Sequence, residues 1–159
     1  MMKALVVFYS MTGNTEKVAR ELARRLEADI EVIEGRAKRS GAIGRLRSVF
    51  EAIFKIPAEN FPSTREDADY DIVVLGGPVW AKNMASPVRA FIRSEGAHIN
   101  NLAVFCTEMG SGGAHVLDQM AALWGGAATA KMTITDDEIK SDMLHKKVSE
   151  FADAILSAQ

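Results

Sequence analysis

The pattern of hydrophobic and polar positions along the chain predicts five strands. Residues 3–9, 70–77 and 102–107 are continuous apolar runs, whereas residues 29–34 alternate between apolar and polar positions. Continuous runs of this kind are typical of parallel strands that are covered on both faces, and the alternating segment suits a sheet edge. Residues 127–134 form a weaker fifth candidate. The chain is therefore expected to build a largely buried parallel sheet.

Helical patterns lie between these strands. Val18, Leu22 and Leu26 recur at the spacing of one helix face after residue 15, which predicts an amphipathic helix. The segment SPVRAFIRS (86–94) predicts a second helix, with Ser86 as its N-cap and Pro87 at its first helical position.

Two further helices are predicted towards the end of the chain. The segment AHVLDQMAALWG (114–125) has a helical pattern and is expected to end at Gly125. The last helix is expected to begin with Thr135 and Glu138, which have the spacing of a capping box. Its buried stripe then consists of Leu144, Val148, Phe151 and Ile155.

The alternation of strands and helices predicts the topology of the sheet. Strand–helix–strand units have right-handed crossovers, so the chain is expected to form a doubly wound α/β sheet. Such sheets bind ligands beyond the carboxyl ends of their strands. Three loops follow predicted strands at that edge, at residues 10–15, 76–85 and 107–113, and all three are rich in Gly, Ser, Thr or Asn.

Residues 36–69 form a long connection that departs from the regular alternation. This basic segment contains a cluster of cationic residues and an amphipathic helical pattern, followed by loop-like sequence at 57–69. We favour a helix that packs as a normal layer of the sheet; a dimer contact and a basic docking surface for an acidic partner are the alternatives. The residues concerned are Arg36, Lys38, Arg39, Arg45 and Arg47 in the cluster and Ile43, Leu46, Phe50 and Phe54 in the helix.

Composition and charge narrow the class of protein. The chain has 159 residues, and residues 1–159 are expected to form a single domain. Its net charge of −2 gives no sign of a nucleic-acid partner. A single cysteine, Cys106, excludes an internal disulfide and suits a reducing compartment. No run approaches the ~18 apolar residues of a membrane span. These features predict a soluble, cytoplasmic protein.

The loop SMTGNT (10–15) has the composition of an anion site. It lies where a strand turns into a helix, and the first amides of a helix lack partners and attract negative charge. The loop supplies three hydroxyl groups, one side-chain amide and one glycine, but no Lys or Arg. This set suits a phosphate monoester held by neutral donors. Simple capping of the helix by the same residues is the alternative, and the composition leaves both open.

Together the three loops resemble those of the flavodoxin family. SMTGNT matches the pattern T/S-x-T-G-N-T of the family's phosphate loop, while GGPVWAKNMASPVRAFI and TEMGSGG match its second and third loops in the expected order. The resemblance implies a three-layer α-β-α fold with a five-stranded parallel sheet in the order 2-1-3-4-5, and FMN as the cofactor.

The resemblance also implies which residues hold FMN. The phosphate would be bound by the first loop, and the two sides of the isoalloxazine ring would be lined by the second and third loops. The site residues so implied are Ser10, Met11, Thr12, Gly13, Asn14 and Thr15; Pro78, Val79, Trp80 and Ala81; and Thr107, Glu108, Met109, Gly110 and Gly113. Trp80 is expected to stack on the ring.

Two departures from electron-carrying flavodoxins bear on the activity. The third loop has no aromatic residue, and the chain lacks the strongly acidic balance of those carriers. Both favour reduction of a quinone or similar acceptor by NAD(P)H over electron transfer to a redox partner protein, although both activities remain open. A flavodoxin-like interaction module that no longer binds flavin is the alternative from another class.

The other reactive side chains have simpler interpretations. Cys106 lies in an apolar strand and is interpreted as a buried structural thiol, and the three histidines lack the spacing of a metal site. Surface or capping is favoured for His115 over a place in the flavin pocket. Glu108 either hydrogen-bonds the ring or a substrate, or points to solvent. Because the redox chemistry would belong to the cofactor, no catalytic residue is predicted.

Overall fold

The computed structural model describes residues 1–34 and 70–159. The basic segment at 36–69, with its cationic cluster, its predicted helix and its loop, lies outside the described residues. Among the described residues, no helix is both long and apolar enough to cross a membrane.

Five parallel strands form the sheet and confirm the predicted topology. They are β1 (Ala4–Phe8), β2 (Asp29–Val32), β3 (Ile72–Trp80), β5 (Leu102–Glu108) and β6 (Lys131–Thr135), in the order β2-β1-β3-β5-β6. Counted along the parallel strands alone, this order is 2-1-3-4-5. A sixth strand that was not predicted, β4 (Asn83–Met84), pairs antiparallel with the end of β3.

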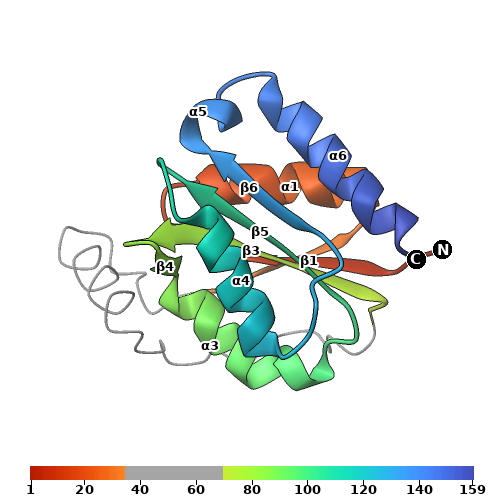
Figure 1. Ribbon diagram of the computed structural model, residues 1–159. Coiled ribbons are helices and arrows are strands. Elements are labelled where there is room, and N and C mark those ends of the chain that lie inside the picture. Colours follow the sequence, from red (N-terminus) through yellow and green to blue (C-terminus); the bar gives the residue numbers. More distant parts are fainter. Residues whose placement is uncertain (35–69) are drawn as a thin grey trace.

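The helices cover the two faces of the sheet (Figure 1). The helices α1 (Asn14–Leu26), α5 (Asp136–Ile139) and α6 (Met143–Ser157) lie on one face. The helices α3 (Ser86–Glu95) and α4 (Gly113–Trp124) lie on the other, with a short 3-10 helix at Gly96–His98 after α3. Each face has its own buried apolar cluster, as the three-layer prediction requires.

Alternate residues of the central strands supply these two clusters. In β1, Val6 and Phe8 point to the α1 side, whereas Leu5 and Val7 belong to the α3 side. All four are at most 1% exposed, which explains why the strand is a continuous apolar run in the sequence.

The beginning of α3 differs from the sequence prediction by one residue. Ala85, not Ser86, is the N-cap of α3, so Ser86 is the first helical residue and Pro87 the second. The predicted N-cap is therefore wrong by one residue, and no side chain among the described residues caps the beginning of this helix; the Ser86 side chain is instead buried, with 1% exposed.

The predicted final helix is two helices. The capping box is present, because Thr135 Oγ1 accepts from the Glu138 amide at 3.2 Å and the Thr135 amide donates to Glu138 Oε2 at 2.9 Å. It begins the four-residue α5, after which the chain turns and starts α6 at Met143. The apolar stripe from Leu144 to Ile155 is buried as predicted, and α4 ends at a left-handed Gly125, also as predicted.

Close packing between β3 and β5 yields a stability prediction. A Cβ added at Gly76 would overlap the ring of Phe105, which is fully buried. We expect Gly76→Ala to lower the free energy of unfolding by about 1–3 kcal/mol, measured by urea denaturation of the apoprotein. Gly110→Ala is the control, because a Cβ there meets nothing within 4 Å. Equal stability of the two variants would contradict the packing argument.

Candidate functional site

Three loops meet at the carboxyl edge of the sheet. They follow β1, β3 and β5, which are direct neighbours in the sheet order. Because the strands are parallel, their carboxyl ends lie at one edge, and the loops at 10–15, 76–85 and 107–113 are brought together there (Figure 1).

A left-handed glycine and a serine shape the first loop. Gly13 has φ 97°, a conformation that favours glycine, and it stands at the N-cap of α1. Ser10 Oγ accepts hydrogen bonds from the amides of Gly13, at 3.1 Å, and Glu16, at 3.2 Å. The chain is thereby folded into a tight turn, and the hydroxyl proton of Ser10 remains available to a ligand.

The first loop also offers donors that the protein itself leaves unused. Among the described residues, no hydrogen bond uses the backbone amides of Asn14 and Thr15 or the side chains of Thr12 and Asn14. Amides at the beginning of a helix attract an anion. The nearest cation, Lys17, donates to the Ile139 carbonyl at 3.3 Å and is therefore engaged elsewhere. The cradle is built from neutral donors.

A buried hydrogen bond ties the first loop to the third. The hydroxyl groups of Thr15 and Thr107 lie 2.8 Å apart, and the two residues are 2% and 3% exposed. Thr15 therefore uses its hydroxyl to join the loops, which leaves its backbone amide as its contribution to anion binding.

The second loop is a tight hairpin between β3 and β4. Ala81 and Lys82 form its tip, with φ 46° and 60°, and Trp80 is paired with Asn83. Two-residue hairpins of this kind need left-handed backbone at both central positions. Lys82 is exposed at this tip, where a Cβ on Gly112 of the third loop would lie 3.1 Å from its Cα.

Trp80 stands at the base of this hairpin but is mostly covered. It is 6% exposed, and its ring meets the Tyr9 ring edge to face at 5.4 Å. Its indole Nε1 is buried and has no hydrogen-bond partner within the part of the chain that the structure describes. Its stacking on a cofactor stays a prediction, and in this structure its ring packs against Tyr9, which directly follows β1.

The third loop is held by its own glutamate. Glu108 Oε2 accepts from the Gly113 amide at 2.8 Å, so the carboxylate binds the beginning of α4. The sequence predicts that Glu108 either hydrogen-bonds the ring or a substrate, or points to solvent. The contact with the Gly113 amide is neither of these. Met109 of this loop is 90% exposed. Gly112 has left-handed backbone, with φ 106°.

Gln119 is a site residue that the sequence did not reveal. From α4 it accepts from the Met84 amide at 3.0 Å and donates to Asn83 Oδ1 at 3.1 Å, which fixes the hairpin. Gln119 Nε2 also lies 3.0 Å from Nε2 of the exposed His115. A polar residue in the middle of a helix pattern gives no signal of such a contact, because its partner is distant in the sequence.

Cys106 is a buried thiol, as interpreted from the sequence. It is fully buried, and its Sγ donates to the Gly113 carbonyl at 3.5 Å. Burial, assisted by the negative charge of Glu108, raises the pKa of Cys106 to about 12. The thiol therefore stays protonated near neutral pH and is no nucleophile.

Metal binding finds no support in the part of the chain that the structure describes. Residues 1–34 and 70–159 contain no group of three or more His, Cys, Asp or Glu side chains placed to hold an ion. His145 Nδ1 lies 2.9 Å from Glu21 Oε1, and His98 Nδ1 lies 3.6 Å from Glu95 Oε2.

Comparison with known proteins adds a family and a fold. A family model described as Flavodoxin matches residues 3–151. The structure resembles a flavoprotein in complex with FMN from Lactobacillus acidophilus NCFM, with a TM-score of 0.69, 18% identity, and coverage of 88% of this chain and 97% of that one.

Two flavodoxin structures are also similar. For oxidised flavodoxin 2 from Bacillus cereus the TM-score is 0.64 at 16% identity, and for a flavodoxin from the domain Archaea it is 0.61 at 18% identity. In both comparisons 99% of each chain is covered. At these identities the likeness concerns the fold.

The hydrogen bond between Thr15 and Thr107 can be tested by a double-mutant cycle. Either Thr15→Val or Thr107→Val leaves one buried hydroxyl unpaired, so each is expected to lower the free energy of unfolding by about 1–3 kcal/mol. The double variant should lose less than the sum, because both hydroxyls are then gone. Strict additivity in urea denaturation would show that the two side chains do not interact.

Proposed function

Because the chain belongs to the flavodoxin family, we propose that it is a redox protein that binds FMN at the carboxyl edge of its sheet. The observation that carries this proposal is the first loop, with its left-handed Gly13, its serine-closed turn and its unused neutral donors. In the family comparison, one similar structure is that of a flavoprotein in complex with FMN.

The first loop fits a single phosphate monoester. Two unused helix amides, the hydroxyls of Ser10 and Thr12 and the side-chain amide of Asn14 would supply donors without a positive side chain. A monoester carries less charge than a diphosphate or triphosphate, so a neutral cradle suits it. These groups hold the phosphate and thereby fix the position of the cofactor.

The second and third loops would line the ring. FMN, once bound, supplies the transfer of one or two electrons. The chain supplies the surfaces: the hairpin with Pro78, Val79 and Ala81 on one side, and the loop from Thr107 to Gly113 on the other. The open backbone at Gly110 lets the main chain approach a flat ligand.

The proposed reaction assigns no acid or base to the side chains of these loops. The carboxylate of Glu108 is occupied by the Gly113 amide, and the thiol of Cys106 stays protonated. His115 is exposed and contacts Gln119. The protein's role is therefore to bind, orient and shield the cofactor.

The electron acceptor is proposed from charge and exposure. A net charge of −2 is small for a protein that docks basic partners, and the third loop has no aromatic residue to cover the ring. Both support the reduction of a quinone or similar acceptor by NAD(P)H over electron transfer to a redox partner protein. We place the reaction in the cytoplasm, which the single reduced cysteine supports.

Variants of the first loop test FMN binding. We expect Thr12→Ala and Asn14→Ala each to weaken FMN binding by about 1–2 kcal/mol, because each removes a hydrogen bond to a charged group. Quenching of FMN fluorescence on titration into apoprotein measures the affinity. Thr129→Ala, which lies outside the three loops, is the control and should bind as the wild type does. Unchanged FMN affinity in both loop variants would show that the phosphate is not bound by the first loop.

The electron source is tested by stopped-flow mixing of FMN-loaded protein with NADH or NADPH. We expect direct bleaching of the flavin absorbance, followed by reoxidation when a quinone is added. Slow bleaching by both nucleotides, with fast reduction by a reductase protein, would favour the carrier. A colourless protein that does not quench FMN fluorescence would instead support the interaction module without flavin.

A further inference from the structure

Arg89 is a buried cation near the beginning of α3. The residue is 7% exposed, and its Nε and Nη2 are buried and have no hydrogen-bond partner among residues 1–34 and 70–159. Burial and the neighbouring charge of Arg93 both lower the pKa of the Arg89 guanidinium, yet arginine stays charged in proteins. A buried charge without a partner is strongly unfavourable. A hydrogen-bond acceptor on a ligand would therefore stabilise this side chain.

The two unpartnered nitrogens belong to one edge of the guanidinium. Nε and Nη2 form the fork that binds two oxygens of one carboxylate or phosphate. In Arg89 both nitrogens of this fork are buried. A hydrogen bond to an anion is stronger in such a buried place than on an exposed surface.

The beginning of α3 favours the same kind of ligand. The ten-residue helix has no side-chain cap at Ala85 and no acidic residue in its first turn. The Arg89 amide bonds the Ala85 carbonyl at 3.1 Å, while no hydrogen bond among the described residues uses the Val88 amide. Arg89 is the fourth residue of this helix, and helical side chains lean towards the helix N-terminus, which is the end where this amide lies.

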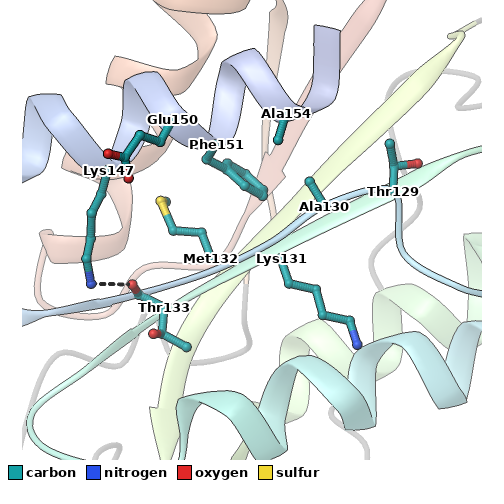
Figure 2. Close-up of a pocket in the computed structure, with 9 residues that line it drawn as sticks. All are labelled: Thr129, Ala130, Lys131, Met132, Thr133, Lys147, Glu150, Phe151 and Ala154. Atoms are coloured by element: carbon teal, nitrogen blue, oxygen red, sulfur yellow. Dashed lines mark hydrogen bonds between the residues drawn. The ribbon is translucent and has the colours of Figure 1, made fainter. Parts of the chain in front are cut away.

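The two lysines that line a groove on the other side of the sheet edge strand β6 are paired, in contrast to Arg89. A groove of about 390 Å³ lies between β6 and α6 and is lined by Lys131 and Lys147 among others (Figure 2). Lys147 Nζ donates to the Thr133 carbonyl at 3.0 Å and to Glu138 Oε2 at 2.8 Å. Lys131 Nζ pairs with Asp118 at 2.8 Å. That groove therefore offers no free cation to a ligand.

Arg89 lies close to the proposed flavin site along the chain. The helix α3 follows β4 directly, and β4 is the second strand of the hairpin that begins at Trp80. We infer that Arg89 and the beginning of α3 form a second oxyanion site, which binds the phosphate or carboxylate group of the small molecule that exchanges electrons with FMN. The existence of the site is independent of FMN, whereas its use in the reaction rests on the proposed function.

Inorganic phosphate is the first probe of this site, and succinate is the carboxylate probe. FMN-saturated protein is used, so that the first loop is already filled, and binding is measured by calorimetry at constant ionic strength. We expect saturable binding of one equivalent by the wild type and about tenfold weaker binding by Arg89→Met. Arg89→Lys should recover part of the affinity, because lysine keeps the charge but not the fork.

Arg93→Met is the matched control. Arg93 lies one turn further along the same helix and is exposed, so its removal changes the net charge equally and should leave phosphate binding within about twofold of the wild type. Equal losses of phosphate affinity in the two variants would show that only the net charge matters, and would overturn the proposal. Unchanged phosphate binding by Arg89→Met would overturn it as well.

A measurement on the wild type covers the event that Arg89→Met does not fold. The Nε–H signal of Arg89, identified in nitrogen NMR spectra by its loss in Arg89→Lys, should shift on phosphate titration with the dissociation constant found by calorimetry. A signal that does not move at saturating phosphate would refute the site directly.

The use of the site in catalysis is tested separately. In FMN-loaded protein Arg89→Met should raise the KM for an anionic reactant such as NADPH about tenfold, while the KM for the neutral quinone menadione and the FMN affinity stay unchanged. Equal effects on both reactants would refute this use. If the protein does not bind FMN, phosphate is titrated into apoprotein carrying Thr12→Ala and Asn14→Ala; Arg89-dependent binding there would support the site and refute its use with flavin.

Discussion

The register of three central strands is the constraint on which the rest of the structure depends. Phe8, Gly76 and Phe105 lie in one row across β1, β3 and β5, and the absence of a side chain at Gly76 makes room for the Phe105 ring. Because this row fixes where the parallel strands lie relative to one another, it also fixes where they end. The three loops of the candidate site therefore meet at one edge.

The loops are then joined by polar contacts that are local in space but distant in sequence. Thr15 and Thr107 connect the first loop to the third, and Gln119 connects α4 to the hairpin of the second. Each contact satisfies groups that would be costly to leave unpaired in the interior. These contacts join the loops without help from a cofactor, and a site that is already formed favours binding because little order has to be created.

The two proposed anion sites differ in the groups that they offer to a ligand. The first loop uses helix amides and hydroxyl groups, and its nearest lysine is engaged with a carbonyl of α5. Arg89 instead presents a buried charged fork. In the two proposals above, the first loop anchors the cofactor and Arg89 contacts the reactant.

The sequence alone predicted the strands, the helices and a doubly wound α/β sheet, because these follow from short-range patterns of burial, capping and glycine placement. The strand order and the assignment of a phosphate loop came from the resemblance to the flavodoxin family. Tertiary structure decided the rest: the pairing of Glu108 with the Gly113 amide, the burial of Trp80 against Tyr9, and the unpartnered fork of Arg89. It also divided the final helix into α5 and α6. The physical reason is that hydrogen-bond partners and burial depend on residues far apart in the chain, which periodicity does not report.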